Sequence, residues 1–253
     1  MARGSGGYGT DGSITIGTNV DMYGMNTGLA KIQKSLRKLS YLTGTAFGII
    51  GLVKFGKAAI DAASDLQEVQ NIVDVSFEDM AYKIEAFSNT CIESFGMSEL
   101  SAKQTAGSFM AMGKAMDLDM ETASDMAVEL TGLSGDMASF YNISQDYARV
   151  ALSAVYTGET ETLKRYGIVL TEANLQQYAL TQGITTSVKQ MDAASKAALR
   201  YNYIMHATAD IQGDFTRTAG NWANQVRLLK EQWTVFLNVV GKGLITVLTP
   251  VLH

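Results

Sequence analysis

Proline is almost missing from this chain: a single one, Pro250, occurs in 253 residues, where average usage would give about a dozen. Because proline interrupts helix interiors, its absence from the first 249 residues predicts long helices joined by glycine turns. Cysteine is equally scarce. The lone Cys91 excludes a disulfide within the chain and is typical of a reducing compartment. The opening run MARGSGGYGTDG has no apolar core and does not match a secretory signal.

Side chains suited to catalysis or metal binding are also few. The two histidines are His206 and His253. A zinc site requires a CxxC, HExxH or other spaced cluster of histidine and cysteine, and the sequence contains none. The acidic run DLDMETASD (117–125) lacks the glycine and glutamate of a calcium loop, so Asp119 is predicted to cap a helix. His206 is predicted to be a packed or partly exposed side chain, and Cys91 a thiol in the core. We expect no enzyme activity, no catalytic or metal-binding residues and no cofactor. A helical hydrolase, the competing idea, lacks a candidate base.

Charge is sparse and unevenly spread. Charged residues make up 18 % of the chain and hydrophobic ones 47 %, against roughly 25 % charged in an average domain, so a packed core is expected. Residues 1–60 carry seven basic and two acidic side chains (net +5), residues 61–161 four and eighteen (net −14), and residues 162–253 nine and five (net +4). Basic ends around an acidic middle favour ordered self-association or charged partners. A plain solvated surface would give the same pattern.

These patterns together predict an all-α fold, an elongated multi-helix assembly. Apolar residues recur at helical spacing through most of the chain, and no convincing alternation of β-branched residues appears after the first residues. The four expected regions are a flexible glycine-rich arm with a possible short strand (1–28), a basic helix followed by a glycine-rich apolar helix (29–63), an acidic multi-helix core (64–211), and a long C-terminal amphipathic helix with a tail (212–253).

The second region combines a basic helix face with an apolar run. Leu29, Ile32, Leu36 and Leu39 share one face, and no acid occurs between residues 22 and 60. The ten uncharged residues 44–53 would extend about 15 Å as a helix, half of what a bilayer core requires. The GxxxG spacing suits close helix packing, although insertion into a membrane surface is the alternative. The candidate membrane or partner contacts are Lys31, Lys34, Arg37, Lys38, Phe47, Ile49, Ile50 and Leu52.

The acidic region is predicted to form a series of short helices, and the residues at which they begin and end can be identified. One apolar stripe runs from Met80 to Phe95 and predicts a helix that Gly96 ends. A second stripe runs from Ala123 to Phe140. Clustered methionines at 110–120 are predicted to be ordinary packing material, or else an adaptable partner surface. The predicted caps are Ser98, Asp119, Ser144 and Thr171, and the predicted stops are Gly96, Gly158 and Gly183.

The C-terminal helix carries the strongest pattern of the sequence. Phe215, Trp222, Leu229 and Phe236 are each seven apart, and a second sevenfold series interleaves with them in steps of four and three. This is the spacing of a coiled-coil seam. A long helix packed on the preceding helices is the equal alternative. Glycines 241 and 243 and Pro250 are expected to end or kink it. The candidate self-association seam comprises Phe215, Trp222, Val226, Leu229, Trp233 and Phe236.

Several runs, taken in order, resemble one known family. They are ASDLQEVQNIVDVSF (63–77), IEAFSNTCIESFGMSELSAKQTAGSFMAMGKAM (84–116), MAVELTGLSGDMASFYN (126–142), TGETETLKRYGI (157–168), LRYNYI (199–204), QGDFTRTAGNWANQVRLLKE (212–231) and TPVL (249–252). In this order they resemble the core region of tail tape-measure proteins of long-tailed phages and prophages. The early DGSITIGTNVD and GLAKIQKSL resemble the beginning of such proteins.

The resemblance implies a structural function without shared catalytic residues. Tape-measure proteins lie in the tail-tube lumen after assembly in the bacterial host cytoplasm, set tail length, and assist genome delivery. The implied partners are the tail-tube protein, tail assembly chaperones, tail-tip or baseplate proteins, further copies in a homo-oligomer, and transiently the host membrane, with no specific nucleic acid. Because relatives are several times longer, we expect a truncated or N-terminal portion. The alternative is a membrane-active helical protein that uses residues 29–57.

Overall fold

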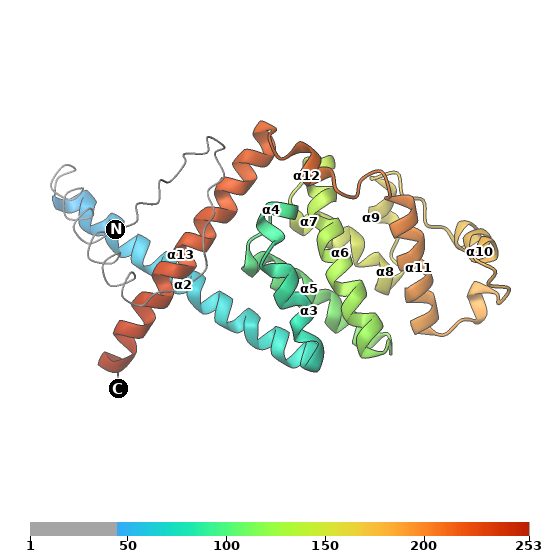
Figure 1. Ribbon diagram of the computed structural model, residues 1–253, viewed down its shortest axis with the longest axis horizontal. Helices are drawn as coiled ribbons and strands as arrows, with labels where there is room; N and C mark the ends of the chain where they lie inside the picture. Colours follow the sequence, from blue (N-terminus) through green and yellow to red (C-terminus); the bar gives the residue numbers. More distant parts are fainter. Residues whose placement is uncertain (1–44, 253) are drawn as a thin grey trace, which may run out of the picture. The chain divides into compact units, whose positions relative to one another are not determined.

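The computed structural model describes the backbone of residues 45–252 and the side chains of residues 53–246. Within these residues every regular element is helical, which confirms the all-α prediction (Figure 1). The elements are α2 (Thr45–Phe77), η1 (Glu78–Met80), α3 (Ala81–Ser88), α4 (Cys91–Phe95), α5 (Glu99–Ala115), α6 (Met120–Phe140), α7 (Gln145–Leu152), α8 (Ala154–Thr157), α9 (Glu161–Lys164), α10 (Glu172–Thr181), η2 (Val188–Gln190), α11 (Ala193–Ala207), α12 (Asp214–Thr218) and α13 (Trp222–Leu252).

The chain divides into two compact units, residues 1–54 and 55–253. The predicted arm, its short strand and the basic helix lie outside the described residues. Helix α2 runs through residue 63 without a break, where the sequence analysis placed a boundary between two regions. In the part of the chain that the structure describes, no helix is both long enough and apolar enough to cross a bilayer.

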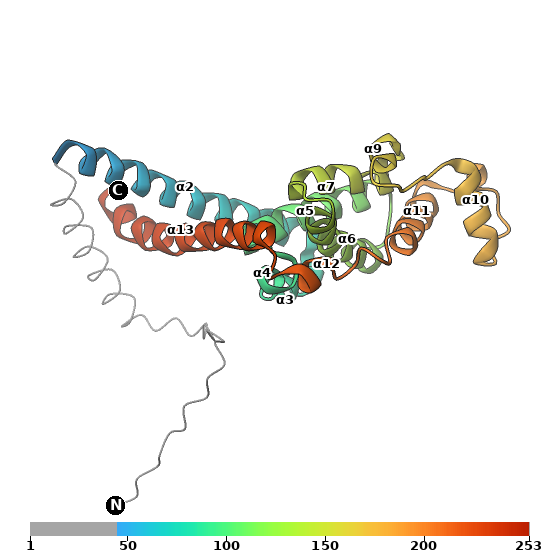
Figure 2. The ribbon, with the colours of Figure 1, turned by 90° about the horizontal axis from the view of Figure 1, so that it is seen from above.

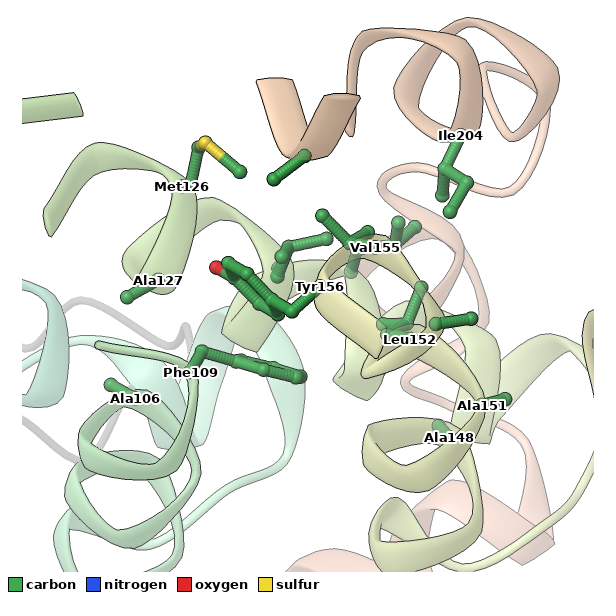
Figure 3. Packing of buried hydrophobic residues seen from close by; sticks show 14 of the residues in the cluster. Ala106, Phe109, Met126, Ala127, Ala148, Ala151, Leu152, Val155, Tyr156 and Ile204 are labelled. Carbon is green, nitrogen blue, oxygen red and sulfur yellow. The ribbon is translucent and has the colours of Figure 1, made fainter. Parts of the chain in front are cut away.

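Helix α6 is the centre of the hydrophobic core. Every residue from 130 to 138 is buried, and α5, α7 and α12 pack around the helix. Small residues let neighbours approach closely: a Cβ on Gly135 would lie 2.8 Å from the carbonyl oxygen of Phe95. Figure 3 shows Phe109 of α5 facing Tyr156 of α8, with their ring centroids 6.2 Å apart. The predicted stripe of α6 is therefore buried from Ala123 onward, except for its last member, Phe140, which is half exposed.

The predicted helix ends are largely confirmed. The four predicted capping side chains accept hydrogen bonds from backbone N–H groups three residues later, as N-caps do. Gly96 and Gly158 adopt the left-handed conformation at helix C-termini, where glycine has no Cβ penalty. The confirmed caps are Ser98 on α5, Asp119 on α6, Ser144 on α7 and Thr171 on α10.

One predicted helix was wrong in its continuity. The stripe from Met80 to Phe95 is divided into η1, α3 and α4, with a turn at Asn89 and Thr90. The turn lets both segments bury side chains, because Ile84 and Cys91 are fully buried on separate helices. The apolar spacing continues across this turn, so the spacing alone could not predict that the helix is interrupted.

A buried cation holds three helices together. Lys103 of α5 is 1 % exposed, and its Nζ lies 2.8 Å from a Glu85 oxygen of α3 and 2.7 Å from a Glu99 oxygen. It also donates to Gln70 of α2 at 2.6 Å. Burial lowers the pKa of this ammonium, but its bonds to the two carboxylates outweigh burial and leave the pKa above its usual value. Lys103 therefore stays charged and ties α2 and α3 to α5.

Candidate interaction surface on helix α13

Helix α13 begins later than the heptad pattern predicted. Phe215 belongs to α12, a separate five-residue helix, and residues 219–221 form a turn before α13. The Phe215 ring is fully buried against Gly96, where an added Cβ would lie 2.3 Å from the ring. Its place in the predicted seam was wrong, because a tertiary contact with α4 takes this side chain into the core.

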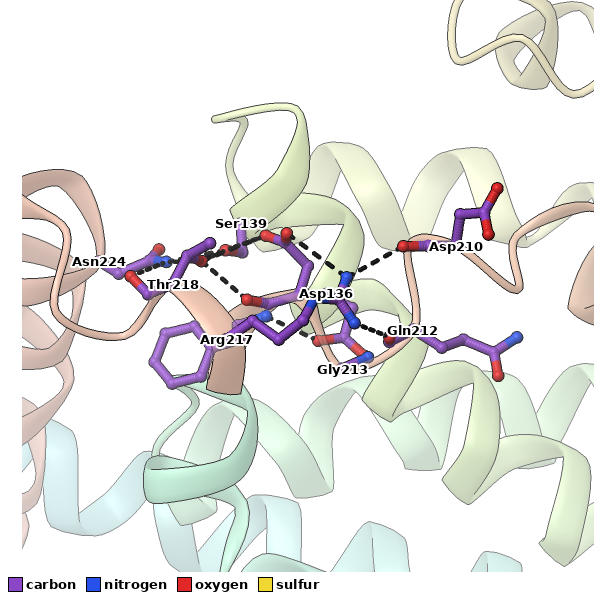
Figure 4. Close-up of polar contacts among 10 residues, drawn as sticks. Asp136, Ser139, Asp210, Gln212, Gly213, Arg217, Thr218 and Asn224 are labelled. Carbon is purple, nitrogen blue, oxygen red and sulfur yellow. Dashed lines mark hydrogen bonds and ion pairs between the residues drawn. The ribbon is translucent and has the colours of Figure 1, made fainter.

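Helix α12 is fixed to α6 by a buried carboxylate. Asp136 accepts hydrogen bonds from the backbone N–H groups of Gly213 (2.7 Å) and Phe215 (3.0 Å), at the N-terminus of α12 (Figure 4). A negative charge is favourable at this end of a helix. Burial raises the pKa of Asp136, and the two backbone donors oppose that rise. Helix α12, which leads into α13, is therefore anchored on the core.

The face of α13 that packs on the core is polar. Asn224, Glu231 and Asn238 are seven residues apart, and all three are buried. Asn224 donates to the Ser139 hydroxyl at 2.8 Å and to the Thr218 hydroxyl at 2.9 Å (Figure 4). Residues seven apart share one side of a helix. Side chains that a surface helix normally presents to water thus face the protein here.

Polar side chains of α13 form hydrogen bonds with the ends of two core helices. Arg227 donates to the carbonyl oxygens of Ala138 (2.8 Å) and Ile143 (3.0 Å), at and just after the C-terminus of α6. Glu231 accepts from the backbone N–H of Ser98 (3.0 Å), at the N-terminus of α5. It also accepts from the hydroxyls of Ser98 (2.6 Å) and Ser101 (3.0 Å).

One side of α13 can reach both helix ends because of the way in which α5 and α6 are connected. Residues 116–119 join the two helices in a tight turn, so the start of α5 and the end of α6 lie together. A helix carries partial positive charge at its N-terminus and partial negative charge at its C-terminus. Glu231 and Arg227, one turn apart on α13, therefore each meet a helix end of opposite charge. Burial lowers the pKa of Arg227, Glu231 partly restores it, and the guanidinium stays protonated.

The opposite face of α13 is apolar and exposed. Trp222 is 83 % exposed, Leu229 68 % and Trp233 54 %. Phe55 of α2 packs on the C-terminal part of this face, with its ring centroid 6.3 Å from Trp233 and 6.1 Å from Phe236. Trp222 and Leu229 nevertheless remain mostly exposed. The exposed seam, as the structure defines it, consists of Trp222, Val226, Leu229, Trp233 and Phe236.

Glycine at 241 marks a helix crossing and does not end α13. The helix continues through residues 241, 243 and 250 to Leu252, so of the two predicted effects, an end or a kink, the end was wrong. A Cβ on Gly241 would lie 1.8 Å from the carbonyl oxygen of Ala59 on α2. Only glycine permits so close an approach of two backbones. Figure 1 shows α13 crossing α2, and Figure 2 shows the two helices next to each other.

The remaining candidates for chemistry have structural partners. The Cys91 thiol is buried and donates to the carbonyl oxygens of Ser88 and Met97. Burial raises its pKa to about 12, which disfavours the reactive thiolate. His206 is exposed on α11, with its ring 5.5 Å from that of Tyr178. Met110 is buried, and the other members of the methionine cluster pack on the core. Among the described residues, no group of histidine, cysteine and carboxylate side chains is placed to hold a metal ion.

An open hollow of about 570 Å³ gathers several cations near α9, α10 and α11. Lys164 pairs with Glu161 at 2.6 Å, and Lys189 lies 3.6 Å from Glu172. Arg200 donates to the carbonyl oxygens at the end of α8. Because these cations already have partners in the protein, the hollow does not present a free charged cluster to a ligand.

The other predicted contact residues fall outside the described side chains. Lys31, Lys34, Arg37 and Lys38 precede the described residues. The backbone of Phe47, Ile49, Ile50 and Leu52 belongs to α2. The buried polar face of α13 was not predicted from the sequence. Its signal was present, since Asn224, Glu231 and Asn238 repeat every seven residues opposite the seam.

Comparison of the chain with protein-family models, with curated proteins and with solved structures finds no match.

Proposed function

We propose that this chain is a structural tail tape-measure protein of a phage or prophage, acting in tail assembly, tail-length determination and genome delivery. The observation that carries the proposal is the ordered series of runs from 63 to 252 that resembles the core of this family. A helical architecture with a long terminal helix suits an extended protein within a tube. The expected partners are the tail-tube protein, assembly chaperones and tail-tip proteins, and the place of action is the tail lumen.

Tail length provides the direct test of this proposal. An in-frame deletion in a helical segment of the complete gene product should shorten tails by about 1.5 Å per residue removed. Tail lengths would be measured by electron microscopy, with a synonymous recoding of the same segment as the control. Tails of unchanged length, or purified tails that lack the chain by immunodetection, would contradict the proposal.

A second candidate is binding to an anionic membrane surface through residues 29–57. It is favoured by six basic residues and no acidic residue in this segment, since each basic side chain near such a surface contributes about 1 kcal/mol. Replacing Lys31, Lys34, Arg37 and Lys38 by glutamine should abolish co-sedimentation with vesicles rich in anionic lipid. Vesicles of neutral lipid are the control. A wild-type chain that ignores anionic vesicles would exclude this candidate.

A further inference from the structure

We infer that the exposed seam of α13 pairs with the same seam of a second copy, and that the two helices lie parallel and in register. The inference rests on the α13 geometry and does not require the tape-measure function. Within the described residues, the seam lies on the side of α13 away from the core, so the core leaves most of it open to solvent.

The docked face prevents α13 from burying the seam by rotation. Arg227 and Glu231 each bond to the end of a core helix, and Asn224 bonds to Ser139 and Thr218. Turning the helix would break these bonds and leave a buried carboxylate or guanidinium without a partner. Such a loss is destabilising, because the charged group keeps its desolvation cost and loses its hydrogen bond.

The exposed area suits a stable contact between proteins. The five seam side chains together expose roughly 600–700 Å², since two tryptophans and a phenylalanine dominate them. A typical stable interface buries about 800 Å² from each partner, and the largest apolar patch on an ordinary monomer is about 300–600 Å². The seam therefore supplies most of what one pairing surface requires.

The spacing of the seam selects a helix with the same spacing. From Trp222 to Phe236 the exposed apolar residues follow steps of four, three, four and three. Side chains in this pattern interlock with an identical pattern on a neighbouring helix. A second copy provides that pattern without requiring any other protein. The stripe extends about 21 Å along the helix at 1.5 Å per residue.

Charge at the flanks of the seam favours the parallel arrangement. Lys230 is the single charged residue beside the seam, and Gln225 and Gln232 lie on its other margin. In a parallel pair, Lys230 of each copy lies opposite Gln225 of the other. The antiparallel pair that covers the longest part of the stripe places the two Lys230 side chains opposite each other, and like charges in such positions are destabilising.

The core also leaves room for this pairing. Because the polar face opposite the seam is the one docked on α5 and α6, the two cores of a parallel pair lie on the outer sides of the joined helices. Phe55 packs against Trp233 and Phe236, the last two members of the seam, and leaves Trp222, Val226 and Leu229 exposed. Pairing therefore covers the exposed tryptophans without displacing the contacts that fix α13.

Analytical ultracentrifugation of the full chain over a wide concentration range tests the pairing. The wild type should self-associate, and Leu229→Asp should weaken association at least about a hundredfold, because a charge would enter each side of the seam. Val239→Asp is the matched control, since Val239 is 56 % exposed on the same helix but is not part of the seam. Far-UV circular dichroism should show unchanged helicity in both variants. A wild type that stays monomeric, or a Leu229→Asp variant that still associates, overturns the inference.

Two further readouts protect the test against a variant that fails to fold. Both tryptophans of the chain lie on the seam, so their emission in the wild type should shift to shorter wavelength as concentration rises. For orientation, Val226→Cys should crosslink to itself under mild oxidation, whereas Val235→Cys should not. Efficient crosslinking only between Val226→Cys and Phe236→Cys chains would overturn the parallel arrangement. A chain found in tails yet monomeric would lose this inference and keep the proposed function.

Discussion

Helices α6 and α13 carry equally clear apolar stripes but use them in opposite ways. The stripe of α6 faces the core and its leucines are buried, whereas the stripe of α13 faces away and Leu229 is mostly exposed. The reverse holds for polar residues, because α13 docks through Asn224, Arg227 and Glu231. The comparison shows that hydrophobic periodicity identifies a face of a helix without identifying what covers it.

The largest expected effect separates the two stripes directly. Leu130→Ala in α6 should lower the free energy of unfolding by about 2–5 kcal/mol, because it leaves a cavity beside fully buried neighbours. The matched Leu229→Ala in α13 should change it by less than about 0.5 kcal/mol in dilute protein. Urea unfolding followed by circular dichroism gives both values. Equal losses in the two variants would mean that the seam is covered within one chain.

The polar docking of α13 can be broken at one residue. Glu231→Ala should cost about 1.5–3 kcal/mol, because it leaves the Ser98 N–H and two hydroxyls without their charged acceptor. Gln232→Ala, at the exposed neighbouring position, is the control. Hydrogen exchange should show faster exchange in both α13 and the first turn of α5. Unchanged exchange in α5 would contradict the capping role of Glu231.

The crossing of α13 and α2 should be sensitive to a single methyl group. Gly241→Ala places a Cβ against the Ala59 carbonyl and should cost about 1–3 kcal/mol through the forced backbone shift. Gly220→Ala provides the control, since nothing lies within 4 Å of an added Cβ there. Thermal unfolding monitored at 222 nm compares the two variants. Equal melting temperatures would show that the helices separate at little cost.

The smallest expected effect concerns the start of α6. The hydrogen bonds from the Thr122 backbone and hydroxyl hold the pKa of Asp119 below its ordinary value of 3.8. The stabilising effect of this cap is fully present above the unfolded pKa and is lost as pH falls through the lowered folded pKa. Asp119→Asn keeps an acceptor without titrating. The difference between wild type and variant in urea midpoint should shrink below about pH 4, the ordinary aspartate range; a difference independent of pH would contradict this role.

Much of the secondary structure could be predicted because its signals are local. Ser98 and Asp119 cap helices through backbone N–H groups three residues away, and Gly96 ends α4 through its own backbone conformation. Phe215 could not be placed in this way. Its spacing fits the seam, but contact with Gly96, more than a hundred residues earlier, draws it into the core. Likewise, the need for glycine at position 241 depends on the close approach of Ala59 on another helix.

The sequence by itself determined that the chain is helical and that α13 has an apolar side, because both follow from residues a few positions apart. Which side of α13 faces the protein was decided only by the tertiary structure. The joined ends of α5 and α6 present backbone groups of opposite partial charge, and Arg227 and Glu231 satisfy them. Burying the backbone groups at these helix ends without hydrogen-bond partners would be costly. The polar face therefore docks on the core, and the apolar seam faces away from it.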